Sequence, residues 1–218
     1  LTMIGTHNGK FHADEALACF MLKQLPDFKS YQVVRSRDPK VLEKCDVLVD
    51  VGGIFNHATR RYDHHQPGFK HTMSTLMGKP YHTLLSSAGL VFAFYGRRII
   101  AQRLEIHERN EKVTMIFSGV YKGFIQEIDR VDNGASLLSS PFVAVGRCKL
   151  VSELNPNGKT VPDAVYDERF HQASALIGGE FLKYIDQLAE GLQISRPSSE
   201  SNSETAALVG IFSFIMWL

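Results

Sequence analysis

The chain has 218 residues, of which 44% are hydrophobic, so it is long enough and apolar enough to bury a globular core. Its formal net charge of +1 excludes a strongly basic surface, so an anionic ligand must be recognised at a local site. The 3 cysteines are far apart and lack metal-site spacing, which excludes a disulfide framework and favours a reducing, intracellular compartment.

The first half of the chain alternates between short apolar segments and helical patterns. Strands are predicted at residues 2–6, 31–36, 46–51 and 60–62, and helices at residues 13–25 and 39–44. This order predicts an α/β fold with a mostly parallel sheet flanked by helices. In such a fold, ligands gather at the carboxyl ends of the strands.

The second half is mainly helical and ends in two unusual segments. Helices are predicted at residues 87–103, 111–132 and 163–191, with a loop at 155–163. Residues 1–191 therefore form the predicted functional domain. Residues 192–205 are serine-rich and are expected to be a disordered linker, and residues 206–218 form an atypical apolar tail.

Neither end of the chain has the pattern of a membrane or targeting segment. The apolar tail is shorter than the roughly 20 residues that a membrane-spanning helix needs, so no stable membrane insertion is expected. We interpret the tail as an out-of-context end. The chain opens directly on a strand-like segment rather than on a targeting peptide, and is expected to be a fragment.

The first group of metal-ligating residue types follows the first predicted strand. It contains His7, His12, Asp14 and Glu15, and Gly9 allows a tight turn between the two histidines. Imidazole and carboxylate groups are suitable ligands for Mn²⁺, Fe²⁺, Co²⁺ or Zn²⁺. Taken alone, the group is equally compatible with surface histidines and ordinary carboxylates in the first turn of a helix.

Two further groups follow later strands. Asp50 ends the apolar run at residues 46–51, where a carboxylate can bridge two cations. In the run Asp63-His64-His65, one imidazole can bind a metal while the other donates to a phosphoryl oxygen, and Asp63 can orient a ligand histidine. Taken alone, Asp50 is more typical of a turn residue or a helix cap than of a metal ligand.

The predicted helix at residues 111–132 ends with a fourth acidic group. Asp129 and Asp132 share one side of this helix, and either can complete a metal site or belong to a solvated face. The nearby cations would suit a phosphate-bearing substrate, and they are Lys10, Arg35, Arg37, Arg60, Arg61 and Lys79. Together the four groups predict a dinuclear centre for phosphoester hydrolysis.

The sequence motifs resemble those of the DHH phosphoesterase superfamily, and most fully those of its Myg branch, a eukaryotic exonuclease family. One matching motif is His7-x4-His12-x-Asp14, and another is Tyr62-Asp63-His64-His65-Gln66. The other matching segments lie at residues 35–38, 49–53, 85–91 and 131–134. The resemblance extends from about residue 4 to residue 191.

This resemblance implies a DHH-type domain that performs 3′–5′ exonuclease hydrolysis of RNA with two Mn²⁺-type cations, in the nucleus and mitochondrion. The implied ligands of one cation are His7, His12 and Asp50, and those of the other are Asp14, Asp50, His64 and either Asp132 or Asp129. The superfamily usually has an aspartate at the position of His12, so the histidine is expected to shift metal preference.

The predicted substrate contacts come from the same region of the chain. His65 is expected to contact the substrate phosphate, with Asp63 beside it as the second catalytic residue. Lys10, Arg60 and Arg61 are predicted to add positive charge around that phosphate. The partner is therefore predicted to be RNA or an oligonucleotide, and the oligomeric state stays open.

Two alternatives to an RNA exonuclease remain at this point. The same metal site would serve a small-substrate phosphohydrolase of the pyrophosphatase type, although Tyr62, Phe69 and Tyr81 near the motifs favour nucleotide stacking. The second alternative is a catalytically incomplete form. The family continues beyond residue 191 into a second domain that closes over the metals, and this chain has the linker and tail instead.

Overall fold

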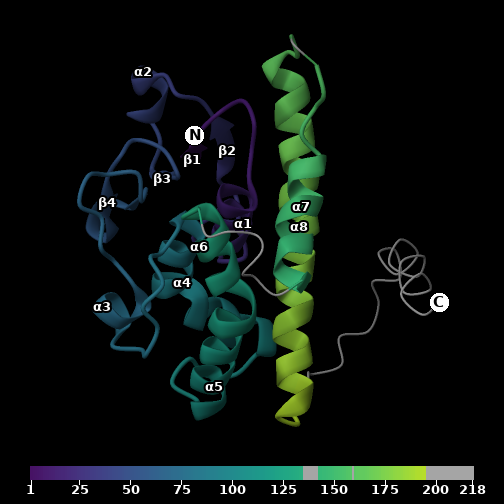
Figure 1. Ribbon diagram of the computed structural model, residues 1–218. Helices are drawn as coiled ribbons and strands as arrows, with labels where there is room; N and C mark the ends of the chain where they lie inside the picture. The colour runs from purple at the N-terminus through teal and green to yellow at the C-terminus, as the bar shows by residue number, and fades with distance from the viewer. Residues whose placement is uncertain (135–141, 159, 195–218) are drawn as a thin grey trace, which may run out of the picture.

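The computed structural model describes residues 1–134, 142–158 and 160–194 (Figure 1). Most of the predicted linker and the whole predicted tail lie outside these residues. Among the described residues, no helix has both the length and the apolar composition that crossing a membrane requires.

The first part of the chain contributes a five-stranded sheet with the strand order β2-β1-β3-β5-β4. The strands are β1 (Met3–Thr6), β2 (Gln32–Arg35), β3 (Val47–Val49), β4 (Phe55–Asn56) and β5 (Arg61–Tyr62). All neighbouring strands pair in parallel except β4, which pairs antiparallel with β5. The sheet is therefore mostly parallel, and the predicted α/β class is confirmed.

Alternating side chains of the central strands pack on opposite faces of this sheet. Val47 and Val49 belong to the main core, whereas Leu48 joins a small cluster with Leu42 and Cys45 on the other face. Leu42 closes α2 (Pro39–Leu42), the short helix of that second face. The main core lies on the face that the long helices cover.

The remaining helices pack mainly around the larger core. They are α1 (Ala13–Lys23), η1 (His57–Thr59), α3 (Met73–Met77), α4 (Ser87–Leu104), α5 (Glu111–Val120), η2 (Tyr121–Ile125), α6 (Gln126–Asp132), α7 (Phe142–Glu153) and α8 (Asp163–Gly191). Helix α1 packs against both α4 and α8 (Figure 1). The carboxyl edge of the sheet, the start of α1 and the start of α4 therefore meet.

Most predicted elements differ from the observed ones by one or two residues at an end, and two of the differences have a clear structural reason. The predicted helix at residues 111–132 is continuous but contains η2, a π-helical turn, in its middle. At this turn Gly123 lies so close to the Tyr184 hydroxyl that a Cβ atom would clash. The predicted strand at residues 60–62 begins only at Arg61, because Arg60 adopts a left-handed conformation (φ 56°) that ends η1.

Helices α7 and α8 lie side by side along one side of the molecule (Figure 1). The bounds of α8 agree with the predicted helix at residues 163–191, and its buried residues recur at helical spacing: Phe170, Ala173, Ile177, Phe181, Ile185 and Ala189. Helix α7 was not predicted. It contacts α1 and α6, so it lies close to the strand ends that bear the predicted metal ligands.

Candidate metal centre

The first histidine–carboxylate group lies where β1 passes into α1. His7 Nε2 is 3.1 Å from Glu15 Oε1 and 3.4 Å from Asp50 Oδ2. His12 precedes α1 and places its Nδ1 atom 3.9 Å from Glu15 Oε2. Glu15 is not in the ligand set that the family resemblance implies, although its position directly after Asp14 at the start of a helix is a usable signal. These three side chains, His7, His12 and Glu15, could hold a metal ion.

Asp50 lies between the first group and the other groups. It directly follows β3, and its two carboxylate oxygens face different histidines. Oδ2 is 3.4 Å from His7 Nε2, whereas Oδ1 is 3.5 Å from His64 Nε2 and 3.2 Å from His65 Nδ1. The carboxylate is buried, and the Ser87 hydroxyl also donates to Oδ1 at 3.3 Å. This geometry suits a bridging ligand.

The second group combines Asp14, His64 and Asp132 from three separate elements. His64 Nε2 is 2.8 Å from Asp132 Oδ2 and 3.9 Å from Asp14 Oδ2. Despite the short distance, His64 Nε2 and Asp132 Oδ2 are both buried atoms without an aligned hydrogen-bond partner among the described residues. Two electron-pair donors in such an arrangement have the geometry expected of ligands that share one cation.

The start of α4 stabilises the negative charge of Asp14. The backbone N–H groups of Ser87 and Ala88 donate to the two carboxylate oxygens of Asp14 at 3.1 and 2.5 Å. Both belong to the first turn of α4, where the helix dipole favours a negative charge. Burial and the charges of Asp132 and Asp50 nevertheless raise the pKa of Asp14 well above its usual value.

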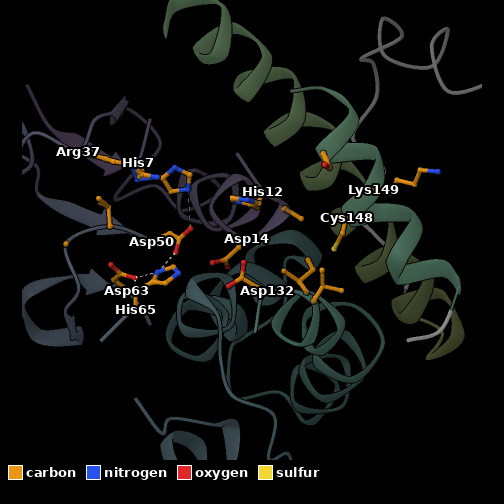
Figure 2. Close-up of a pocket in the computed structure, with 16 residues that line it drawn as sticks. His7, His12, Asp14, Arg37, Asp50, Asp63, His65, Asp132, Cys148 and Lys149 are labelled. Atoms are coloured by element: carbon orange, nitrogen blue, oxygen red, sulfur yellow. Dashed lines mark hydrogen bonds and ion pairs between the residues drawn. The ribbon is translucent and has the colours of Figure 1, made fainter. Parts of the chain in front are cut away.

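His65 and Asp63 form a hydrogen-bonded pair at the mouth of the site (Figure 2). Asp63 Oδ1 lies 2.8 Å from His65 Nδ1, and Asp63 Oδ2 accepts from the Gly53 N–H at 2.6 Å. The His65 side chain is 64% exposed, so its Nε2 atom is available to a ligand. Asp50 and Asp63 outweigh the effect of partial burial and raise the pKa of His65 to about 9.

Asp129 is held in a different environment from Asp132. Asp129 Oδ1 accepts from the Ser86 N–H at 2.9 Å and from the Ser86 hydroxyl at 2.8 Å, and Oδ2 accepts from the Tyr121 hydroxyl at 3.0 Å. Gly89 lies against this carboxylate and leaves no room for a Cβ atom. These hydrogen bonds tie Asp129 of α6 to the capping residue of α4, whereas Asp132 faces His64.

A cavity of about 830 Å³ opens over these groups (Figure 2). Its walls include His7, His12, Asp14, Arg37, Asp50, Asp63, His65, Asp132, Cys148, Lys149 and Ser152. The last three residues lie on α7, so this helix, which was not predicted, supplies one wall of the cavity. Apart from histidines, no aromatic side chain lines the described part of the cavity.

The three predicted phosphate-binding cations do not line this cavity among the described residues. The Arg61 guanidinium donates to the carbonyls of Cys45, Asp46 and Thr59 at the opposite edge of the sheet. Arg60 lies over the Phe28 ring at 5.3 Å. Lys10 is exposed in the turn before α1. Arg60 and Arg61 lie at the start of β5, whereas the Asp-His-His run follows its end, so neighbours along the chain point to opposite edges of the sheet.

Arg37 lines the cavity, although it was not among the predicted phosphate contacts. It follows β2, lines the cavity and lies on the His7 side of it (Figure 2). Lys149 also lines the cavity, but its ammonium is 3.6 Å from Glu153 on the exposed side of α7. The signal for Arg37 was its position just after a strand of a parallel sheet.

The residues present fit a metal ion on chemical grounds. Imidazoles and carboxylates are mixed N and O ligands of the kind that Mn²⁺, Fe²⁺ and Zn²⁺ accept. Three buried polar atoms lack aligned hydrogen bonds in the described structure, and bound cations would satisfy them: Glu15 Oε2, His64 Nε2 and Asp132 Oδ2. The site therefore could hold metal, and its donor atoms fall into more than one group.

The fold and the site define an α/β protein with a histidine–carboxylate centre at the carboxyl edge of its sheet. A family model named for the MYG1 exonucleases and described as "Uncharacterised protein family (UPF0160)" matches residues 3–207. The chain therefore belongs to this family. No solved structure matched the fold, so the wider DHH resemblance stays a prediction.

Curated relatives from distant eukaryotes agree with this assignment. A MYG1 protein of Caenorhabditis elegans is 46% identical over 86% of this chain and 56% of its own length. The MYG1 exonuclease of Homo sapiens is 43% identical over 84% of this chain and 50% of its own length. A MYG1 protein of Saccharomyces cerevisiae is 39% identical over 84% of this chain and 56% of its own length. The chain thus spans about half the length of these relatives.

Proposed function

We propose that this chain carries the metal centre of a metal-dependent phosphodiesterase that degrades RNA from the 3′ end. The observation that carries the proposal is the position of Asp50, which offers one oxygen to His7 and the other to His64. A carboxylate between two ligand groups is what a dinuclear hydrolytic centre requires. The name of the Homo sapiens relative, MYG1 exonuclease, supports a nuclease.

The proposed ligands fall into two sets that share Asp50. The first set is His7, His12, Glu15 and Asp50, and the second is Asp14, Asp50, His64 and Asp132. This assignment adds Glu15 to the set implied by the family resemblance and chooses Asp132 over Asp129. We propose Mn²⁺ as the cation in both sets, because mixed histidine and carboxylate ligands suit it.

The chain's own residues would position the substrate for in-line attack. When bound, the cations supply an activated water at neutral pH and neutralise the charge of the phosphoryl group. His65 keeps its Nδ1 atom on Asp63 and Asp50, which leaves Nε2 to donate to a phosphoryl oxygen. Asp63 acts on His65 by fixing the direction of its ring and favouring the charged form.

Arg37 is the proposed contact for a second phosphate of the substrate. The guanidinium group of an arginine can hold a phosphate through two parallel hydrogen bonds. Arg37 lines the same cavity as His7 and is exposed, so a phosphodiester next to the one being cleaved could reach both. In this role it replaces Lys10, Arg60 and Arg61.

A small-substrate phosphohydrolase is a second candidate function, and the wall of the cavity favours it. Recognition of single-stranded RNA usually uses aromatic rings as stacking surfaces, but the described wall offers only histidines. Tyr62 is fully buried and bonded to Tyr95 at 2.8 Å, and Tyr81 packs on Tyr121.

An RNA assay tests the proposed function directly. The chain is incubated with Mn²⁺ and a 5′-labelled single-stranded RNA, beside an Asp50→Asn variant that keeps the shape of the side chain. We expect a ladder that shortens from the 3′ end, reduced at least about 100-fold in the variant, since one charge-stabilising ligand is worth roughly that much. Equal activity of the variant would overturn the dinuclear proposal.

Two further substrates distinguish the candidates. Hydrolysis of pyrophosphate or a dinucleotide, with intact RNA left uncut, would favour the small-substrate enzyme. Tight Mn²⁺ binding with no hydrolysis of any of the three would show a catalytically incomplete form. The predicted location in the nucleus and mitochondrion is a proposal that rests on the family resemblance alone.

A further inference from the structure

The turn that connects His7 to His12 is held at three of its four residues, two of which bond to the second half of the chain. The Asn8 side chain donates to Asp163 Oδ2 at 3.1 Å, and the Gly9 carbonyl accepts from Arg35 at 2.7 Å. The third contact involves the backbone of Phe11. Since this turn sets the distance between two proposed ligands, its fixation bears on the metal centre.

Asn155 makes the contact with Phe11, through two hydrogen bonds. Its Oδ1 atom accepts from the Phe11 N–H at 2.9 Å, and its Nδ2 atom donates to the Phe11 carbonyl at 2.8 Å. The amide thus pairs with both backbone polar groups of Phe11, the residue before His12, as a neighbouring strand would. Asn155 lies between α7 and α8, and Nδ2 also donates to the Ser152 carbonyl at 3.2 Å, which holds the amide in position.

The Phe11 ring is fixed from the same side. Phe11 is 1% exposed and meets the Phe170 ring of α8 edge to face, at a centroid distance of 5.9 Å. The Arg35 guanidinium lies over both rings, 5.6 Å from Phe11 and 4.7 Å from Phe170. It also pairs with Asp167 at 3.0 Å, so α8 and the turn form one packed unit.

We propose that Asn155 is a positioning residue for the His7–His12 side of the metal centre. It touches no proposed ligand side chain and acts through the Phe11 peptide, which directly precedes His12. The residues of the second cation set come from the start of α1, the ends of β3 and β5 and the end of α6, and the hydrogen bonds of Asn155 go to none of them. Its effect should therefore be confined to one of the two cations.

This inference rests on the proposed function, because it assumes that the site binds two cations. Loss of a residue that orients metal ligands typically lowers metal affinity by about 10–100-fold. We expect Asn155→Ala to weaken one Mn²⁺ step by that factor and to leave the other step unchanged. Asn155→Asp keeps the acceptor for the Phe11 N–H but loses the donor to its carbonyl, so its effect should be intermediate.

Calorimetric titration of the whole chain with Mn²⁺ measures both steps, and amide hydrogen exchange at Phe11 gives a second readout without metal. Asn157→Ala is the matched control, since Asn157 is an exposed asparagine in the same loop. Faster exchange at Phe11 with selective loss of one Mn²⁺ step supports the proposal. Equal weakening of both steps with a lower Tm, or no change in either, would overturn it.

The same titration distinguishes a failure of the proposed function from a failure of the positioning role of Asn155. A wild-type chain that binds no Mn²⁺ would contradict the proposed function and, with it, the metal-positioning role of Asn155. A wild-type chain that binds two Mn²⁺ ions with no selective effect of Asn155→Ala or Asn155→Asp would contradict the positioning role alone.

Discussion

At the scale of single residues, the proposed centre depends on how each acidic side chain is surrounded. Asp50 has a left-handed backbone (φ 55°), a conformation that aspartate tolerates better than most residues. Asp50 directly follows β3, and this conformation turns its carboxylate toward both His7 and His64. The preference explains why Asp50→Asn is a gentler test than a substitution with alanine.

Asp129 and Asp132 should respond differently to the same substitution. Asp132→Asn is expected to weaken Mn²⁺ binding by at least about 10-fold with little change in Tm, because Asp132 faces His64. Asp129→Asn is expected to leave Mn²⁺ binding largely intact but to lower the unfolding free energy by about 1–3 kcal/mol, because an amide cannot accept every hydrogen bond of Asp129.

Calorimetry with Mn²⁺ and thermal unfolding of the two variants check this prediction. The buried Ser86 and Tyr121 donors that bond to Asp129 make its loss a folding defect. The opposite result, metal loss in Asp129→Asn and a normal metal site in Asp132→Asn, would reverse the proposed ligand assignment.

The charge state of His7 predicts how metal binding depends on pH. Burial lowers its pKa, but the carboxylates of Asp50 and Glu15 outweigh this and raise it to about 10. A cation must therefore displace the proton of His7 at neutral pH. The apparent Mn²⁺ affinity should rise with pH by roughly tenfold per pH unit for each displaced proton.

Titrations in two buffers of different ionisation enthalpy measure the protons released. For folding without metal, the dependence on pH has the opposite sign: the free energy of unfolding falls as the pH rises. The stability from the raised His7 pKa is complete below the usual value of 6.5 and is lost as the pH rises toward about 10. An Mn²⁺ affinity that is independent of pH between 6 and 8, with no proton release, would contradict a role of His7 as ligand.

At the scale of elements, the start of α4 is the point where the site and the core meet. Its N–H groups bind Asp14, and its capping residue Ser86 binds Asp129. Gly89→Ala should destabilise the chain by about 1–3 kcal/mol, because the added Cβ would meet the Asp129 carboxylate. Gly179→Ala in α8 is the matched control.

The control should have the opposite sign. A Cβ at Gly179 would meet no atom within 4 Å, and alanine in a helix is favoured over glycine by about 0.8–1 kcal/mol. Urea unfolding of both variants checks the pair. A stable Gly89→Ala variant with unchanged unfolding would show that the carboxylate of Asp129 is not fixed as described.

The elements show which parts of the fold the sequence could predict. Strong periodicity placed α8 at its observed bounds, and the alternation of strand and helix patterns predicted the parallel sheet. The two-residue β4 carries too little pattern to be recognised. The π-helical turn in residues 121–125 was missed because a helical period averages over such local widening.

At the scale of the whole molecule, the position of the proposed site could be predicted from the strand topology, whereas the cavity could not. Since β1, β3 and β5 run parallel, the residues after each strand meet at one edge, which the sequence order alone predicts. The wall from α7 was not predictable, because the apolar residues of Phe142–Glu153 do not follow one side of a helix. Glu15 and Arg37 were undervalued, since spacing along the chain does not show which side chains face a cavity.

The direct measurement for the central claim is anomalous diffraction at the manganese edge from crystals of the chain grown with Mn²⁺. We expect two peaks roughly 3.5–4 Å apart, which is the separation typical of dinuclear hydrolytic centres. One peak should lie beside His7 and His12, the other beside His64 and Asp132, with Asp50 between them. A single peak, or peaks away from Asp50, would contradict a dinuclear centre bridged by Asp50.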